Sequence, residues 1–381
     1  MNISEKKISR REFLKKSAEI FIKLGVINSL LEFLLQKESF AQGISEFEAK
    51  YYQKISEDKV KCLLCPNNCI LSNGETGFCR ARRAYRGKLY SLVYGKLCAL
   101  HVDPIEKKPL FHFLPGTTIF SIATAGCNFR CKFCQNWHIS QVGPEEVYNY
   151  EVLPYWVIEE TQKNNCPSIA FTYTEPSIFY EYMLDTAKLA KSRGIRTMYH
   201  SNGSLNPSAV NELSLYLDAA NIDLKAFPPQ FYREICSGYL ETVLETLKIL
   251  KKKGVWLEIT NLVIPTLNDD LEKIKEMCNW IRDNLGEEVP LHFSRFHPQY
   301  KLTHLSSTPI TTLEKAKKVA EEVGLRFVYI GNVPGHPGEN TYCPKCKEIL
   351  IKRRGFLVLE NNLEPEGKCK FCGENIPGIW S

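Results

Sequence analysis

Cysteine is the residue type whose number and spacing in this chain most directly predict chemistry. Of the 15 cysteines in 381 residues, 11 fall into three clusters, whereas Cys98, Cys166, Cys236 and Cys278 stand alone. Disulfide frameworks belong to small secreted domains, while Cys-x-x-Cys groups in a chain of this length are typical of metal ligation. The pattern therefore predicts three metal sites, and we interpret the isolated cysteines as small buried hydrophobic residues.

The central cluster, Cys127-x-x-x-Cys131-x-x-Cys134, places three cysteines in one short loop. Three thiolates can bind three irons of a cubane iron–sulfur cluster and leave the fourth iron without a protein ligand. An open iron can bind and activate another molecule, just as an open position distinguishes a catalytic zinc from a structural one. No fourth cysteine follows nearby in the sequence, so we interpret this loop as a catalytic cluster site.

The first cluster consists of Cys62, Cys65, Cys69 and Cys79, with turn-forming proline and glycine residues between them. Four thiolates so close in sequence suit a closed tetrahedral site, most simply structural zinc. An auxiliary iron–sulfur cluster uses the same four ligands, and this alternative stays open.

The third cluster pairs Cys343 and Cys346 with Cys369 and Cys372 around two expected short strands, at residues 349–351 and 356–359. Two Cys-x-x-Cys groups around a hairpin are typical of a zinc ribbon. Such ribbons often bind nucleic acid, but the charge around this one is mixed. The sequence therefore favours a structural role for the third site.

The middle of the chain must supply the scaffold for the three-cysteine loop. Between residues 118 and 335, short β-rich runs alternate with segments of helical period. Strands are expected at residues 119–125, 168–173, 195–201, 219–226, 255–264, 289–295 and 326–330, and helices at 178–192, 242–252, 271–284 and 311–322. Repeated β-α units predict a parallel sheet covered by helices, either doubly wound or curled into a full or partial barrel. In both folds, chemistry gathers at the carboxyl ends of the strands.

Several further motifs accompany the cysteine loop, in which aromatic Phe133 stands directly before the third cysteine. They are Asp103-Pro104-Ile105-Glu106-Lys107-Lys108-Pro109-Leu110, Cys134-Gln135-Asn136, Tyr173-Thr174-Glu175-Pro176, Ile222-Asp223-Leu224-Lys225 and Gly331-Asn332. With the loop, they resemble the radical S-adenosylmethionine (SAM) enzymes of the AmmeMemoRadiSam-system type, which are relatives of the pyruvate formate-lyase activating enzymes. The resemblance covers the chain from about residue 58 onward.

The resemblance implies roles for residues around the loop. Cys127, Cys131 and Cys134 would ligate a 4Fe–4S cluster whose open iron takes the amino and carboxylate groups of SAM. Phe133 and Thr174 would lie beside the cofactor, Glu175 would meet the methionine amino group, and Asn202 would lie near the ribose or carboxylate. The family has Gly-Gly-Glu-Pro where this chain has Tyr173-Thr174-Glu175-Pro176. Without the two glycines, the backbone should approach the ligand less freely.

The resemblance also places Asp223, Lys225 and His297 beside the cofactor, with Lys225 as the natural partner of its carboxylate. Each assignment has a structural alternative. Glu175 could instead be a carboxylate that favours the start of a helix, and Asp223 with Lys225 could be a buried ion pair. His297 could be an ordinary core or turn histidine.

The expected fold is a partial (β/α)6-type TIM barrel of the radical SAM class with a cysteine-ligated module on either side. We expect a leader or amphipathic helix at residues 1–41, a four-cysteine module at 42–115, the barrel at 116–335 and the zinc-ribbon-like module at 336–381. The leader is predicted from Ser9-Arg10-Arg11-Glu12-Phe13-Leu14-Lys15, which has the form of a twin-arginine export signal.

The amino-acid composition of the chain argues against two classes of protein, those that bind nucleic acid and those that span a membrane. The net charge of +6, from 49 basic and 43 acidic residues, is not concentrated in any block, so nucleic acid is not expected as a partner. Charged residues interrupt every apolar stretch, so no transmembrane segment is expected. We expect cytoplasmic function, where SAM and low-potential donors are found, with export or envelope association as the alternative.

The predicted function is reductive cleavage of SAM to a 5′-deoxyadenosyl radical, which abstracts hydrogen from an unidentified metabolite or protein substrate. A reductase or ferredoxin-type electron donor and system partner proteins are the expected partners. The first alternative is an activase that installs a glycyl radical on a partner enzyme. The second, of another class, is a zinc-dependent nucleic-acid or protein-binding module, which leaves the three-cysteine loop unexplained.

Overall fold

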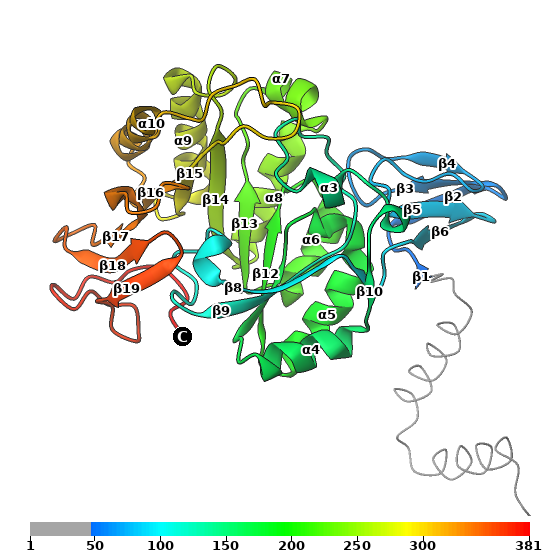
Figure 1. The fold of residues 1–381 in the computed structure, drawn as a ribbon, viewed down its shortest axis with the longest axis horizontal. Coiled ribbons are helices and arrows are strands. Elements are labelled where there is room, and N and C mark those ends of the chain that lie inside the picture. The colour runs from blue at the N-terminus through cyan, green and yellow to red at the C-terminus, as the bar shows by residue number, and fades with distance from the viewer. Residues whose placement is uncertain (1–46) are drawn as a thin grey trace, which may run out of the picture. The chain divides into compact units, whose positions relative to one another are not determined.

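An eight-stranded sheet forms the centre of the protein, in the order β16-β15-β14-β13-β12-β11-β9-β8 (Figure 1). The computed structural model describes residues 47–381, and the expected leader at residues 1–41 lies outside them. The strands are β8 (Ala99–Pro104), β9 (Thr118–Ala123), β11 (Ser168–Phe171), β12 (Arg196–Ser201), β13 (Ala219–Asp223), β14 (Trp256–Val263), β15 (Leu291–Arg295) and β16 (Val328–Gly331).

The strands from β9 to β16 are parallel, and only β8 pairs antiparallel, with β9. Strands β8 and β16 are the two edges, so the sheet is open, and the partial form of the expected barrel is confirmed. All four residues of β11 are buried, as expected for a strand with both faces covered. The expected strands at 119–125 and 326–330 correspond to β9 and β16 with shifts of a few residues.

Helices connect the parallel strands and cover the sheet. They are α4 (Pro154–Lys163), α5 (Tyr180–Ser192), α6 (Pro207–Leu213), α8 (Leu240–Lys252), α9 (Leu271–Leu285) and α10 (Ile310–Val323), with shorter α3 (Trp137–Ser140) and α7 (Pro229–Phe231). Helix α8 buries Leu240, Val243, Leu247 and Leu250, which recur every three or four residues on one face. Helix α9 begins at the Asp270 cap, whose carboxylate accepts from the amides of Glu272 and Lys273.

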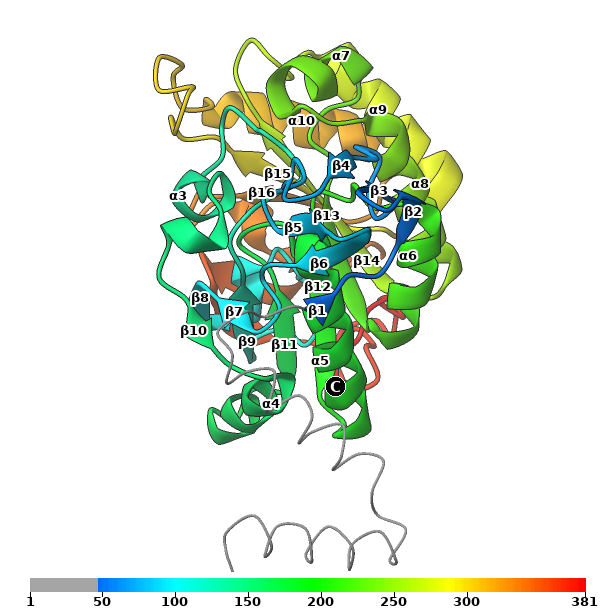
Figure 2. The same ribbon diagram turned by 90° about the vertical axis from the view of Figure 1, so that its right-hand side faces the viewer.

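The N-terminal module consists of short antiparallel strands, and it faces the viewer in Figure 2. Its two sheets are β2-β3-β4 and β1-β6-β5, and β7 pairs with β10. The strands are β1 (Phe47–Glu48), β2 (Tyr52–Ser56), β3 (Lys59–Cys62), β4 (Ile70–Ser72), β5 (Arg82–Tyr85), β6 (Lys88–Ser91), β7 (Lys96–Leu97) and β10 (Tyr150–Glu151). A fully buried ion pair of 2.5 Å between Arg82 and Glu181 joins this module to α5.

The C-terminal module is a three-stranded sheet of β17 (Thr341–Tyr342), β18 (Ile349–Arg354) and β19 (Leu357–Asn361). The buried Arg353 side chain donates to the Phe111 carbonyl oxygen at 2.9 Å, and the Leu114 amide donates to the Ile379 carbonyl at 2.7 Å. These contacts tie the module to the segment between β8 and β9. Within residues 47–381, no helix is long and apolar enough to cross a membrane.

Candidate active site at the carboxyl ends of the strands

The three-cysteine loop follows β9 and is held in place by backbone hydrogen bonds. The Arg130 amide donates to the Cys236 carbonyl oxygen at 2.7 Å, and the Lys132 amide donates to that of Ile235 at 3.0 Å. Both acceptors lie in a one-turn π-helix, η5 (Tyr232–Cys236). A loop whose amides are fixed in this way presents its cysteines in a defined arrangement before any metal binds.

The three thiols fit a multi-iron cluster better than a single ion. Among the described residues, only the C-terminal cysteines bring three or more ligand atoms within 4.8 Å of one another. The sulfurs of Cys127, Cys131 and Cys134 are therefore spread more widely than one ion requires, and a cubane cluster can bridge such a spacing. Burial raises the pKa of the Cys127 and Cys134 thiols, and bound iron would supply the positive charge that favours the thiolates.

Asn202, at the end of β12, contacts the same loop. Its side-chain amide donates to Asn128 Oδ1 at 2.8 Å and lies 3.9 Å from Cys127 Sγ. Its backbone amide donates to Glu175 Oε2 at 2.8 Å. The structure thus brings together Cys127, Glu175 and Asn202, three residues that the sequence placed at one site.

Glu175 lies after β11 and is buried. Its carboxylate accepts from the Ser177 amide at 3.0 Å and so caps the short 3-10 helix η3 (Pro176–Phe179). It also accepts from the Ser201 hydroxyl at 2.7 Å. Burial raises the pKa of Glu175 despite these donors. The Glu175 carboxylate therefore stabilises the start of a helix, which was the structural alternative for this residue. Its contact with a methionine amino group stays a prediction.

The Tyr173-Thr174 segment takes the place of the two glycines in the family motif. Tyr173 adopts the left-handed conformation that glycine favours, with φ of 61°. The Asn136 side chain donates to the Tyr173 carbonyl at 2.7 Å, and the Thr174 hydroxyl donates to the Thr124 carbonyl at 2.8 Å. The backbone therefore keeps a glycine-like path even though both glycines are missing.

Asp223 and Lys225 form an ion pair of 2.8 Å at the end of β13. Burial alone would lower the pKa of Lys225, but the negative charge of Asp223 outweighs burial and raises it. The Lys225 ammonium lies 5.5 Å from the centre of the Phe133 ring, so this pair adjoins the cysteine loop. The ion-pair alternative is therefore present in the structure, and a role toward a carboxylate stays a prediction.

His297 is exposed in the loop after β15, and its ring nitrogen Nδ1 lies 3.3 Å from the Ser307 hydroxyl. Contact of His297 with the cofactor stays a prediction. Sequence reasoning missed Asn128, Ser177 and Cys236, which contact the loop or Glu175. Only their nearness to the motifs could have indicated the first two, and lone Cys236 had no sequence signal. Ser201, which the sequence placed near the cofactor with Asn202, donates to Glu175.

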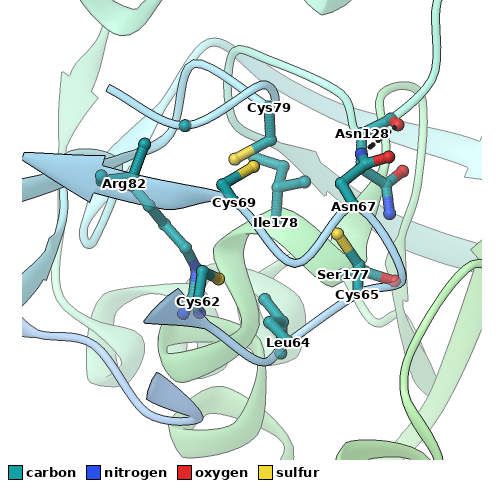
Figure 3. Close-up of a pocket in the computed structure, with 12 residues that line it drawn as sticks. Cys62, Leu64, Cys65, Asn67, Cys69, Cys79, Arg82, Asn128, Ser177 and Ile178 are labelled. Carbon is teal, nitrogen blue, oxygen red and sulfur yellow. Dashed lines mark hydrogen bonds between the residues drawn. The ribbon is translucent and has the colours of Figure 1, made fainter. Parts of the chain in front are cut away.

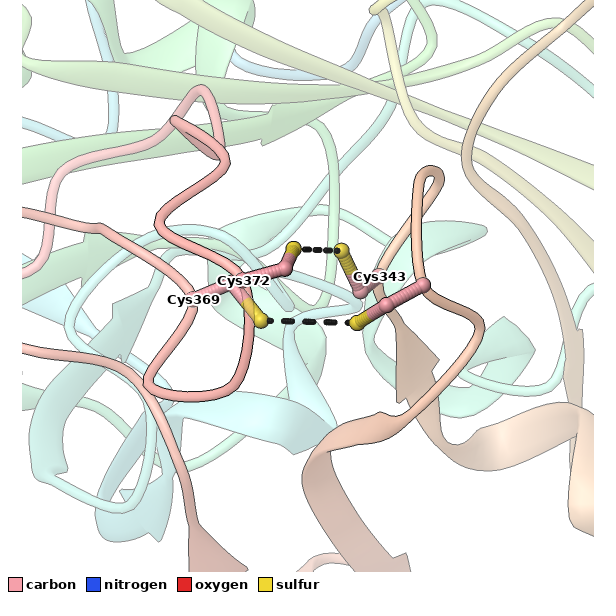
Figure 4. A group of neighbouring side chains, drawn as sticks. Cys343, Cys369 and Cys372 are labelled. Atoms are coloured by element: carbon pink, nitrogen blue, oxygen red, sulfur yellow. Dashed lines mark hydrogen bonds between the residues drawn. The ribbon is translucent and has the colours of Figure 1, made fainter.

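The C-terminal cysteines form a compact group (Figure 4). The sulfurs of Cys343 and Cys372 lie 3.6 Å apart, and those of Cys346 and Cys369 lie 3.7 Å apart. Zinc bound to four thiolates at bond lengths of 2.3 Å holds its sulfurs about 3.8 Å apart. The group is therefore suited to a single tetrahedral metal ion.

Comparisons with known proteins agree with this geometry. A sequence model of the radical SAM superfamily matches residues 121–281. An uncharacterized protein of Methanocaldococcus jannaschii is 50% identical over 330 residues, which cover 86% of this chain and 98% of that protein. The chain belongs to the radical SAM superfamily. Membership implies a 4Fe–4S cluster and SAM as cofactors.

More distant relatives of this radical SAM protein include named activating enzymes. The pyruvate formate-lyase-activating enzyme of Clostridium pasteurianum is 24% identical over 218 residues, 52% of this chain and 88% of that protein. Among solved structures, Streptococcus suis SuiB bound to S-adenosylmethionine is 14% identical, with a TM-score of 0.46, over 63% of this chain and 56% of that one. The family match and the sequence relatives named as activating enzymes confirm the resemblance to radical SAM and activating enzymes.

Proposed function

We propose that this radical SAM protein cleaves SAM reductively and abstracts hydrogen from a metabolite or protein substrate. The observation that carries the proposal is the convergence of Cys127, Glu175 and Asn202, from the ends of β9, β11 and β12, around one loop. Side chains at the carboxyl ends of parallel strands are where barrel enzymes bind their substrates.

When bound, a 4Fe–4S cluster would supply one electron to the SAM sulfonium, which yields methionine and a 5′-deoxyadenosyl radical. Cys127, Cys131 and Cys134 would hold three of its irons. Lys225 would neutralise the carboxylate of the cofactor, and Asp223, which raises the pKa of Lys225, keeps its ammonium charged. The buried Glu175 network fixes the turn between β11 and α5, so the site does not have to rearrange when cofactor binds.

The first prediction tests this assignment. Anaerobically reconstituted protein, once reduced, should convert SAM to 5′-deoxyadenosine and methionine. A variant with Cys127, Cys131 and Cys134 replaced by alanine should lose this product, because it lacks the ligands for the open cluster. Chromatography measures the amount of 5′-deoxyadenosine formed. The matched control is Cys278→Ala, which alters a buried cysteine outside the three clusters. Unchanged turnover in the triple variant would refute the proposal.

A glycyl-radical activase is the second candidate, and the matches to named activating enzymes favour it. These include a putative glycyl-radical enzyme activating enzyme of Methanocaldococcus jannaschii, 26% identical over 167 residues. An activase should generate a stable protein-centred radical on a partner enzyme and release 5′-deoxyadenosine in equal amount. Electron paramagnetic resonance (EPR) of mixtures with glycyl-radical enzymes distinguishes this candidate from an enzyme that acts on a metabolite.

We also propose that the catalysed reaction takes place in the cytoplasm. Reduction requires a reductase or ferredoxin-type donor, and an open iron cluster is vulnerable to oxidants outside the cell. System partner proteins would then share this compartment with the enzyme.

A further inference from the structure

The first four-cysteine set surrounds a cavity. Cys62, Cys65, Cys69 and Cys79 line it together with apolar residues such as Leu64 and Ile178 (Figure 3). Its volume of about 20 Å³ exceeds the roughly 10 to 15 Å³ that one water molecule needs. The four thiols therefore enclose a space larger than one water molecule. Polar side chains line it too, namely Asn67, Arg82, Asn128 and Ser177.

The same chain provides a direct comparison with a closed site. The C-terminal cysteine sulfurs lie in pairs 3.6 and 3.7 Å apart, and all four fall within 4.8 Å. The N-terminal cysteines do not meet that spacing, although all four are among the described residues. A single zinc ion needs its sulfurs about 3.8 Å apart. A four-iron cubane uses the same four thiolates but holds them at its corners, farther apart.

A second observation comes from Arg82, which lines the cavity and is only 1% exposed. Its terminal nitrogens donate to the Lys50 carbonyl oxygen and to Glu181, but its Nε has no hydrogen-bond partner. A buried donor without an acceptor destabilises the folded state. Sulfur atoms of an anionic cluster in this cavity would provide the missing acceptor. The Phe78 amide already donates to Cys69 Sγ at 3.5 Å.

We propose that Cys62, Cys65, Cys69 and Cys79 bind an auxiliary 4Fe–4S cluster that passes single electrons to the cluster at Cys127, Cys131 and Cys134. One electron enters from a ferredoxin-type donor, which is oxidised while the auxiliary cluster is reduced. The same electron then leaves for the second cluster, so the auxiliary cluster returns to its oxidised state and no bond changes. The relay rests on the proposed function, whereas the cluster itself does not.

Contacts between the two cysteine loops support the relay. Asn67, between Cys65 and Cys69, donates to the Asn128 carbonyl oxygen at 3.1 Å, and Asn128 follows Cys127. Gly126, which precedes Cys127, has a φ of 101°, and a Cβ there would lie 2.5 Å from the Cys79 carbonyl oxygen. Only glycine allows this approach. The two metal sites are thus direct neighbours, with a hydrogen bond between their loops.

Metal content tests the cluster without any catalytic readout. The variant with Cys127, Cys131 and Cys134 replaced by alanine should keep about four irons and four sulfides per chain after anaerobic reconstitution, roughly half the wild-type amount. Adding Cys65→Ala and Cys69→Ala should remove them, while zinc at the C-terminal cysteines persists. A triple variant that binds a second zinc and neither iron nor sulfide would overturn the proposal.

Mössbauer spectroscopy of iron-57-labelled wild-type protein covers the case in which a variant does not fold. Adding SAM should change the spectrum of one iron in one cluster and leave a second cluster of equal intensity unchanged. If all the iron belongs to the SAM-responsive cluster, the auxiliary cluster does not exist.

Reduction kinetics test the relay. Reduction of the cluster at Cys127 by a ferredoxin-type donor can be measured over time from the EPR signal of that cluster. In the Cys65→Ala/Cys69→Ala variant, the fast phase of this reduction should be lost. Equal rates in wild type and variant would eliminate the relay. Because this signal does not depend on SAM cleavage, failure of the relay and failure of the proposed function give different results.

Discussion

Asp103 organises the motif that precedes the first parallel strand. Its carboxylate accepts from Lys107 at 2.8 Å and from buried Lys108 at 2.6 Å, and the Tyr173 hydroxyl donates to it as well. Lys108 also lies 4.2 Å from the centre of the Tyr173 ring. One carboxylate therefore connects two motifs that are far apart in the sequence, and it anchors the residue with the left-handed backbone.

Asp103→Asn should destabilise the protein by about 3 kcal/mol, because Lys108 would become a buried charge without its partner. The denaturation midpoint measures this loss. Tyr173→Phe removes one neutral donor and should cost only about 1 kcal/mol. Asp103→Asn combined with Lys108→Met should recover part of the loss, since the uncompensated charge is gone. If the Asp103→Asn single variant unfolds at the wild-type midpoint, Asp103 does not have this stabilising role.

At the residue level, the sequence indicated the cysteines and the strand-end polar residues as candidates, because their types and spacing are local signals. It could not identify their supports. Arg82 and Glu181 are 99 residues apart, and neither stands in a motif, yet they form a fully buried pair. Cys236, far from the loop in sequence, likewise contacts it from the π-helix: its carbonyl oxygen accepts from the Arg130 amide, and its thiol interacts with that of Cys131.

At the scale of elements, the amino ends of the strands carry a buried polar network of their own. Glu258, in β14, accepts from His292 at 2.7 Å and from the His112 amide at 2.8 Å. The His112 ring lies 2.6 Å from the Tyr329 hydroxyl and 2.7 Å from the Pro377 carbonyl. The carbonyl can only accept, so Nδ1 carries the proton and Nε2 accepts from tyrosine. This network joins the barrel to the C-terminal module.

The His112 ring gives this network a pH dependence. Burial lowers its pKa from 6.5 to about 4, so between these values the unfolded chain binds a proton that the folded chain does not. The free energy of unfolding should therefore rise with pH from about 4 to 6.5 and level off above. His112→Gln keeps one donor and one acceptor and should flatten that part of the profile. Urea titrations at several pH values measure the free energy of unfolding of both proteins. If it rises equally with pH in wild type and variant, the assignment is wrong.

We expect the C-terminal sheet to depend on a metal ion bound by its four cysteines. Cys343→Ala should release one metal ion per chain and lower the melting temperature, because metal-binding energy is folding energy in such modules. Cys278→Ala, at a buried cysteine in α9, should leave metal content unchanged. Elemental analysis with thermal unfolding measures both effects. A change in the spectrum of the catalytic cluster before any loss of metal would argue against a structural role.

The parallel strands and long helices were predictable because their apolar spacing is regular and they carry turn residues at their ends. Strand β8 was missed because Ala99–Pro104 lacks that regularity, and its pairing with β9 comes from tertiary context. Helix α6 is only seven residues long, too short for a periodic signal. The N-terminal strands have two to five residues each, so their sheets depend on packing and on the cysteine site.

At the scale of the whole molecule, residues 47–381 form one compact unit, in which both cysteine modules pack against the barrel. The N-terminal module places the Cys79 carbonyl against Gly126, next to the three-cysteine loop, and the C-terminal module closes the amino ends of the strands. We therefore expect that neither module can be removed without damage to the barrel.

The leader can be tested separately from this unit. Residues 1–45 fused to a reporter that works only after twin-arginine export should give weak export, because we propose cytoplasmic function. Replacing Arg10 and Arg11 by lysine in the same fusion is the control. Strong export that this control abolishes would overturn the cytoplasmic proposal.

The hydrogen bonds between residues 112–114 and residues 377–379 also bear on how the protein is made. His112 and Pro377 are 265 residues apart, which corresponds to roughly 13 to 53 s of synthesis on a ribosome. During that interval Phe111 and Phe113, both buried in the finished protein, lack the C-terminal residues that pack against this segment. We expect nascent chains that stop before residue 377 to be cleaved by protease between β8 and β9 and to recruit chaperones there.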